Sequence, residues 1–154
     1  MDENKKNIRL WLYLLSTVKI IESELQLRMR NNFNSSLSRF DILSQLERNP
    51  EGIRMGLLSE LIIVTAGNIT GLATRLEKDG LIIRLPDPDD RRASIIKITQ
   101  TGLDLFYEMK TQHQAWINEL LAGIKTEDKE ILSSLLSSTK SKVNDIVHQH
   151  PILK

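Results

Sequence analysis

The 154-residue sequence contains no cysteine, so disulfides, thiol-based redox sensing and cysteine-ligated zinc are excluded. Long uncharged apolar runs are also missing. Residues 1–7 are polar and charged, and the apolar segment that follows is interrupted by Arg9, Lys19, Glu22 and Glu24. We therefore expect no signal peptide and no membrane span, and we expect a cytoplasmic protein.

The sequence also lacks an excess of charge of one sign, because its formal net charge is only +1. A protein that binds nucleic acid with this balance needs a local basic patch instead. Arg28, Arg30 and Arg39 have no acid between them, and Arg91 and Arg92 are adjacent. The apolar fraction of 40% and the charged fraction of 27% fit one soluble globular domain over residues 1–154.

A short helix with two unlike faces is predicted between Val64 and Gly80. Thr65 is its expected N-cap and Gly80 its expected stop. The apolar face carries residues at helical spacing, namely Ile69, Leu72 and Leu76. The opposite face carries the polar residues Asn68, Thr70, Thr74 and Arg75.

Two glycines, Gly67 and Gly71, fall inside this predicted helix and should each cost it roughly 1 kcal/mol relative to alanine. A helix whose backbone approaches a phosphate or a base edge gains from missing Cβ atoms, and Asn, Thr and Arg are side chains that bond there. The alternative is an ordinary amphipathic helix that tolerates two glycines. We predict DNA contacts for Thr65, Asn68, Thr70, Gly71, Thr74 and Arg75.

A charged hairpin follows this helix. Residues 81–85 and 94–99 are rich in Ile and Leu, and the prolines between them, in residues 86–90, predict a projecting loop. Arg91 and Arg92 at the end of the loop suit insertion into a narrow DNA minor groove. A solvated charge cluster is the alternative. We expect Asp90 to pair with Arg75 and so to stabilise the wing against the helix.

The flanking segments are predicted to be helical. One long helix covers residues 8–31, a loop covers 31–36, and Ser38 with Asp41 caps a helix that ends near Arg48. Residues 53–55 predict a third strand and residues 56–63 a small helix. Thr101 with Asp104 begins a helix that ends near residue 123, and a last helix begins near Lys125 and ends at Pro151.

The apolar band of the first long helix is too wide for one neighbour. A partner subunit is the simplest cover, and an unusually buried helix in a monomeric bundle is the alternative. The predicted fold is mainly α with a small β-hairpin wing: a winged helix-turn-helix over residues 37–99, with N- and C-terminal dimerisation helices in residues 1–32 and 102–150.

Three short motifs carry a resemblance to a known family. They are the run LEKDGLI from Leu76 to Ile82, the run DRR from Asp90 to Arg92, and Ile98-Thr99 followed by Gly102. In order and spacing they resemble the MarR family of bacterial transcription regulators, with Ile98 where leucine is usual. Residues 64–72 resemble the subset of that family associated with aromatic-acid catabolism. The resemblance covers essentially the whole chain.

Regulators of this family usually bind a small molecule between the dimerisation helices and the winged unit, and the bound ligand lowers the affinity for DNA. The residues expected at that crevice are Trp11, Tyr13, Arg39, Phe40, His113 and Trp116. An arginine and a histidine beside tryptophans could bind an aromatic carboxylate as the effector. The resemblance implies the coenzyme A thioester of such an acid as a second candidate. The alternative is that both tryptophans belong to the core and Arg39 contacts a DNA phosphate.

Enzyme chemistry has little support. The three histidines, His113, His148 and His150, form no metal-ligand spacing, and neither a Gly-rich phosphate loop nor a nucleophile elbow is present. We expect no metal and no cofactor. The predicted function is a ligand-responsive repressor that binds a pseudo-palindromic operator as a homodimer; the alternative is a winged-helix protein-interaction module without specific DNA binding.

Overall fold

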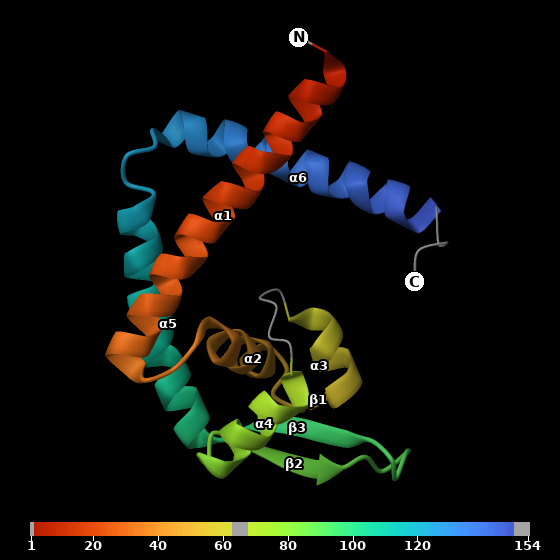
Figure 1. Ribbon diagram of the computed structural model, residues 1–154. Helices are drawn as coiled ribbons and strands as arrows, with labels where there is room; N and C mark the ends of the chain where they lie inside the picture. Colours follow the sequence, from red (N-terminus) through yellow and green to blue (C-terminus); the bar gives the residue numbers. More distant parts are fainter. Residues whose placement is uncertain (1, 63–67, 150–154) are drawn as a thin grey trace. The chain divides into compact units, whose positions relative to one another are not determined.

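A computed structural model describes residues 2–62 and 68–149, and the chain divides into two compact units, Met1–Trp116 and Ile117–Lys154. The elements run in the order α1 (Glu3–Phe33), α2 (Leu37–Arg48), β1 (Ile53–Arg54), α3 (Met55–Leu61), α4 (Ile69–Lys78), β2 (Ile82–Pro86), β3 (Ser94–Ile98), α5 (Gln100–Leu120) and α6 (Thr126–Gln149) (Figure 1). The predicted class, mainly helical with a small wing sheet, is confirmed.

The wing is a three-stranded antiparallel sheet in the order β1-β3-β2. Ile82 pairs with Ile98 and Pro86 with Ser94, while Ile53 of the short third strand pairs with Ile96. Strand β3 is therefore central, and Pro86, which has no N–H to donate, lies in an edge strand where that loss is tolerated. The predicted hairpin and third strand are both confirmed.

Several helix ends differ from prediction, and three of them lie in α1, α2 and α5. Ser36, not Ser38, caps α2, because its Oγ accepts the Arg39 N–H at 3.2 Å. Thr99, not Thr101, caps α5, because its Oγ1 accepts the Gly102 N–H at 3.0 Å. Helix α1 continues through Phe33 and ends at Asn34 with φ 48°, so the predicted loop over 31–36 begins too early. Near the N-termini of α2 and α5 more than one Ser or Thr residue could serve as the N-cap, and the backbone conformation determines which one does.

The predicted stop at Gly80 is confirmed. Its φ of +74° is a left-handed conformation that glycine adopts without strain. The Gly80 N–H donates to the Glu77 carbonyl and the Leu81 N–H donates to the Leu76 carbonyl, each at 2.9 Å. This pair of bonds satisfies the last carbonyls of α4 and turns the chain directly into the wing.

The core of the first unit lies among α1, α2, α3, α4, α5 and the wing sheet. Its largest fully buried side chains are Met29, Ile42, Leu43, Leu46, Leu58, Leu76, Ile82, Ile96 and Met109. Because Leu76 and Ala73 anchor one side of α4 in this core, the opposite side of the helix stays exposed.

Two helices leave apolar side chains uncovered. Residues 8–20 of α1 expose Ile8, Leu10, Trp11, Leu12, Tyr13, Val18 and Ile20, and α6 exposes Ile131, Leu132, Leu135, Leu136, Val143, Ile146 and Val147. No helix in residues 2–62 and 68–149 is both long enough and apolar enough to cross a bilayer. The predicted stop of the last helix at Pro151 lies outside the described residues.

Candidate nucleic-acid interface

Helix α4 begins three residues later than predicted. Asn68 is its N-cap, and the Asn68 Oδ1 accepts the Gly71 N–H at 2.8 Å. The prediction of Thr65 as the cap is therefore wrong, since Asn68 fills that role. Thr65 itself and Gly67 lie outside the described residues, so Gly71 is the one of the two predicted glycines that the structure places inside the helix.

Gly71 lies close to the capping side chain of Asn68. A Cβ at this position would lie 2.6 Å from the Asn68 Nδ2, which is closer than real Cβ atoms approach. The missing side chain thus makes room for the capping amide, a role that the glycine spacing alone does not reveal. The exposed face of α4 presents Asn68, Thr70, Thr74 and Arg75, as predicted from the helical spacing.

The wing is tied to α4 by Arg84, not by the predicted pair of Asp90 with Arg75. Asp90 Oδ1 accepts the Arg92 N–H at 2.9 Å, and Arg75 Nε donates to the Gly71 carbonyl at 3.4 Å. Both groups are engaged within their own segments. The structure therefore overturns the predicted Asp90–Arg75 pair, although Asp90 does stabilise the wing turn.

Arg84 reaches α4 from the edge strand β2. Its Nη2 donates to the Thr74 Oγ1 at 2.7 Å and to the Thr70 carbonyl at 3.4 Å, and its Nε lies 3.2 Å from the Glu77 Oε2. Arg84 follows the buried Ile82 by two residues, so both side chains face the same side of the sheet. A charged residue at such an inward position is the sequence signal that could have identified this contact.

A second acid, Asp87, organises the base of the wing loop. Its carboxylate is buried, accepts the Asp89 N–H at 2.9 Å and lies 2.5 Å from the Arg54 Nε. The hydrogen bond from the Asp89 backbone, followed by the charge of Arg54, holds the pKa of Asp87 below its usual value. The sequence did not point to this residue, because Arg54 lies far from it in the chain.

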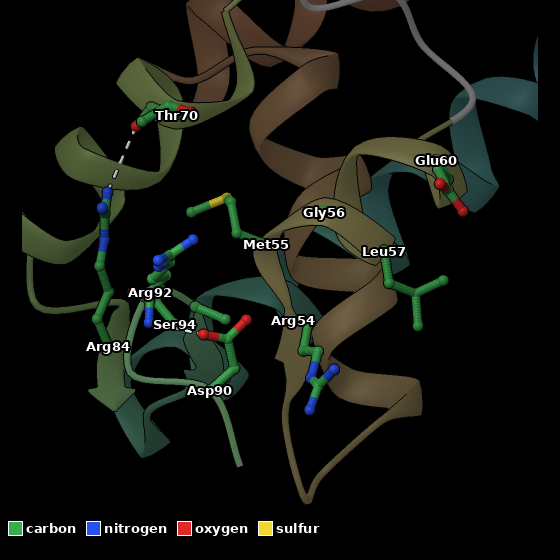
Figure 2. A pocket seen from close by; sticks show the side chains of 11 residues that line it. Arg54, Met55, Gly56, Leu57, Glu60, Thr70, Arg84, Asp90, Arg92 and Ser94 are labelled. Atoms are coloured by element: carbon green, nitrogen blue, oxygen red, sulfur yellow. Dashed lines mark hydrogen bonds between the residues drawn. The ribbon is translucent and has the colours of Figure 1, made fainter. Parts of the chain in front are cut away.

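Helices α3 and α4 and the wing enclose a groove of about 670 Å³. It is lined by Arg54, Met55, Gly56, Leu57, Glu60, Thr70, Arg84, Asp90, Arg92, Ala93 and Ser94. Figure 2 shows Arg84 of β2 extending toward Thr70 of α4 on one side of this groove, and Leu57 and Glu60 of α3 on the other side. Helix α4 and the wing residue Arg92 therefore border the same groove.

The arginines of this surface differ in whether they form ion pairs. Arg54 and Arg84 face carboxylates, whereas Arg75, Arg91 and Arg92 form no ion pair within the described part of the chain, and all three are exposed. Exposed guanidinium groups without carboxylate partners beside threonine hydroxyls can bind the phosphates and base edges of a nucleic acid.

The six residues predicted for an effector crevice do not come together. Phe40 lies 4.8 Å from His113 and 5.5 Å from Phe106, measured between ring centroids, and Trp116 lies 6.3 Å from Phe33. Burial lowers the pKa of His113. Phe33 and Phe106 belong to these ring contacts but were missed, because a single aromatic at helical spacing resembles any core residue.

Trp11 and Tyr13 lie elsewhere. Both are exposed, and the Tyr13 hydroxyl accepts a hydrogen bond from Arg9 at 3.0 Å. Tyr13 precedes Phe33 by twenty residues on the same helix, a distance of roughly 30 Å along the axis. Arg39 donates to the Asp79 carboxylate at 2.6 Å, which joins the start of α2 to the end of α4.

Within residues 2–62 and 68–149, no group of three or more histidine or acidic side chains is arranged to hold a metal ion. His113 and His148 lie on different helices, and His150 is outside the described residues.

Comparison with known proteins identifies the family. Residues 36–94 match the family model described as the MarR family. The crystal structure of a MarR family transcriptional regulator from Silicibacter pomeroyi is 31% identical, covers 93% of this chain and 99% of its own, and superposes with a TM-score of 0.82. The chain belongs to the MarR family.

Other relatives of this MarR protein agree with that assignment. The Homoprotocatechuate degradative operon repressor of Escherichia coli is 33% identical over 69 residues, which are 45% of this chain and 47% of the repressor. An organohalide-sensing regulator crystallised in a 2,4-dichlorophenol-bound form shares the fold, at a TM-score of 0.79 and 24% identity over 97% of this chain and 90% of that one. The protein is a transcriptional regulator of the winged helix-turn-helix type.

Proposed function

We propose that this MarR regulator is a ligand-responsive repressor that reads a pseudo-palindromic operator as a homodimer. Residues 37–99 form the DNA-binding unit, and helices within residues 1–32 and 102–150 form the dimer contact, all within one functional domain of residues 1–154. Helix α4 enters the major groove and the wing enters the next minor groove. The contacting residues are Thr65, Asn68, Thr70, Gly71, Thr74, Arg75, Arg91 and Arg92.

One observation carries the DNA part of the proposal. Thr70 of α4 and Arg92 of the wing line the same groove, and Arg92 has no carboxylate partner among the described residues. A backbone phosphate between helix and wing would lie beside this cation. The alternative, a protein-interaction module, has no comparable observation in its favour.

The test replaces Arg92 with alanine and measures retention on heparin and on duplex DNA from the upstream region of the protein's own gene. Arg48→Ala is the matched control, because Arg48 is equally exposed and lies outside the groove. We expect Arg92→Ala to weaken binding and to reduce the slope of log affinity against log salt by about 0.9, the value for one lost phosphate contact. Unchanged retention with unchanged thermal stability would refute the proposed interface.

The dimer part rests on uncovered apolar surface. Helix α6 has no buried residue among those described and exposes seven large apolar side chains, and α1 exposes a further set in its first half. Exposed apolar surface of this extent marks an association site. Leu135→Asp should lower the molar mass measured by light scattering, whereas Ser134→Asp, a neighbouring exposed residue, should not. A wild-type monomer at micromolar concentration would exclude the palindrome model.

The effector part is an aromatic carboxylate, or its coenzyme A thioester, bound near Phe40, His113 and Trp116. Support comes from two buried polar atoms, Ser35 Oγ and Arg39 Nε, that have no hydrogen-bond partner in the described part of the chain. A carboxylate satisfies both a hydroxyl and a guanidinium N–H. The Escherichia coli relative takes its name from an operon for the degradation of homoprotocatechuate, an aromatic acid.

Benzoate and phenylacetate should raise the melting temperature and change tryptophan fluorescence, while phenol at the same concentration should do so less. Arg39→Gln should abolish the carboxylate preference. Asp79→Asn, which removes the partner of Arg39 and keeps the guanidinium, should retain it. An equal response to phenol and benzoate in the wild type would refute a carboxylate site. Trp11 and Tyr13 are not needed for this site.

A further inference from the structure

The contact between Arg84 and Thr74 constrains what Thr74 can recognise. Thr74 is exposed on α4, and its hydroxyl has two neighbours in the protein. The hydroxyl donates to the Thr70 carbonyl at 3.0 Å, and it accepts from the Arg84 Nη2 at 2.7 Å. A hydroxyl has one proton to donate and two lone pairs. Its proton and one lone pair are therefore engaged, which leaves one lone pair and the γ-methyl group for DNA.

Arg84 is itself held in place. Its Nε lies 3.2 Å from the Glu77 carboxylate, its Nη2 also reaches the Thr70 carbonyl at 3.4 Å, and the side chain is three-quarters buried. Figure 2 shows the guanidinium extending from β2 toward Thr70. A planar guanidinium with contacts on two sides keeps its orientation. The Thr74 side chain therefore cannot turn its hydroxyl toward DNA about χ1 without losing both the bond to the Thr70 carbonyl and the charge-assisted bond from Arg84.

We propose that Arg84 is a specificity-determining residue, because it fixes Thr74 as an acceptor and so excludes guanine from the base position that Thr74 contacts. Guanine presents only acceptors, N7 and O6, in the major groove. Adenine and cytosine present an amino donor, and thymine presents a methyl group. This inference rests on the proposed placement of α4 in the major groove. Arg84 acts through Thr74 and need not touch the DNA.

Selection from random duplexes tests the proposal. Comparison of the wild type with Thr74→Ala, an exposed substitution, locates the base position that depends on Thr74. We expect guanine to be disfavoured there by roughly three- to tenfold, the effect of one net hydrogen bond. A wild-type preference for guanine at that position, or no position that responds to Thr74→Ala, overturns the proposal without any change at Arg84.

Variants of Arg84 test whether this residue controls the base preference at the position that Thr74 contacts. Arg84→Met removes the bond that helps to hold the Thr74 rotamer, so the side chain can turn its hydroxyl from the Thr70 carbonyl toward DNA and donate there. The discrimination against guanine should then fall to under about twofold, because guanine regains the hydrogen bond. Arg84→Lys keeps a cation near Glu77 and should restore much of the discrimination. Thr74→Val has neither a proton nor a lone pair, so adding Arg84→Met to Thr74→Val should cause no further change in base preference at that position.

The double variant separates specificity from stability. A merely structural role for Arg84 would lower the melting temperature and weaken binding to all sequences, with no change at a single base position. Continued exclusion of guanine by folded Arg84→Met, or a change in base preference between Thr74→Val and the double variant, overturns the proposal. Failure of the wild type to retain any duplex is a different result, and it refutes the proposed function itself.

Discussion

The two halves of helix α1 carry similar apolar side chains and lie in opposite surroundings. In the second half, Leu25 and Met29 are 5% and 0% exposed, whereas in the first half Ile8, Trp11 and Leu12 are 61%, 57% and 54% exposed. Apolar residues at helical spacing show that a surface is to be covered. They do not show whether the same chain or a second chain covers it.

The same contrast separates the winged region from α6. Helices α2 and α4 and the wing sheet each contribute fully buried side chains. Three ion pairs, from Arg39, Arg54 and Arg84, join different elements of this region. The described part of α6 has no buried residue. The winged region is therefore a pre-formed unit, which a protein needs if helix and wing are to present fixed positions to DNA.

The largest effect expected from this comparison is at Met29. Met29→Ala should lower the free energy of unfolding by about 2–5 kcal/mol, because it leaves a cavity in a fully buried site. Leu27→Ala, on the same helix at a half-exposed position, is the matched control and should cost less than about 1 kcal/mol. Urea denaturation measures both. Equal costs would show that burial of the Met29 side chain is not the cause of the loss.

Two glycines give the next contrast. A Cβ at Gly102 would lie only 2.1 Å from the Leu81 carbonyl oxygen, so Gly102→Ala should destabilise the protein by about 1–3 kcal/mol through overpacking against backbone. A Cβ at Gly123 would meet no atom of the described residues within 4 Å, so Gly123→Ala should be neutral or slightly stabilising. Thermal denaturation compares the two. A loss of similar size at both positions would show that close packing at Gly102 is not the cause.

Local chemistry made much of this fold predictable. Gly80 specifies the end of α4, and the Ile- and Leu-rich segments separated by prolines specify the wing strands, through backbone preferences within a few residues. The cap of α4 was mistaken because Thr65 and Asn68 are both suitable cap residues, and the choice depends on where the helix first packs. The exposed polar face of α4 followed from helical spacing alone.

The contacts between segments were not predictable in the same way. The Arg84 bond to Thr74 and the Asp87 pair with Arg54 join residues ten and 33 positions apart, and they depend on the angle at which strand and helix meet. The expected Asp90–Arg75 pair joined the right segments through the wrong residues. The sequence offered several possible pairs of arginine and carboxylate, and the relative position of strand and helix determines which pair forms.

Acid should weaken the wing through Asp87. Its pKa is lowered in the folded state, so its contribution to stability is complete above the ordinary carboxyl pKa of 3.8 and is lost as the pH falls through the folded-state value. Asp87→Asn should be less stable than the wild type at pH 7, and the difference should shrink below about pH 4. Asp145→Asn, on exposed α6, makes the same change of charge as a control. A constant difference across the pH range would exclude Asp87 as the titrating group.

The smallest expected effect is at His113, in the packed region beside Phe40. Burial lowers its pKa below 6.5, so the neutral form is favoured in the folded state. As the pH falls below 6.5 the unfolded chain takes up the proton first, and stability decreases until the folded-state pKa is reached. His113→Gln should flatten the melting temperature between about pH 7 and pH 5, whereas His148→Gln on exposed α6 should leave its slope unchanged. If the melting temperatures of the wild type and His113→Gln change in parallel with pH, titration of His113 does not contribute to the pH dependence of stability.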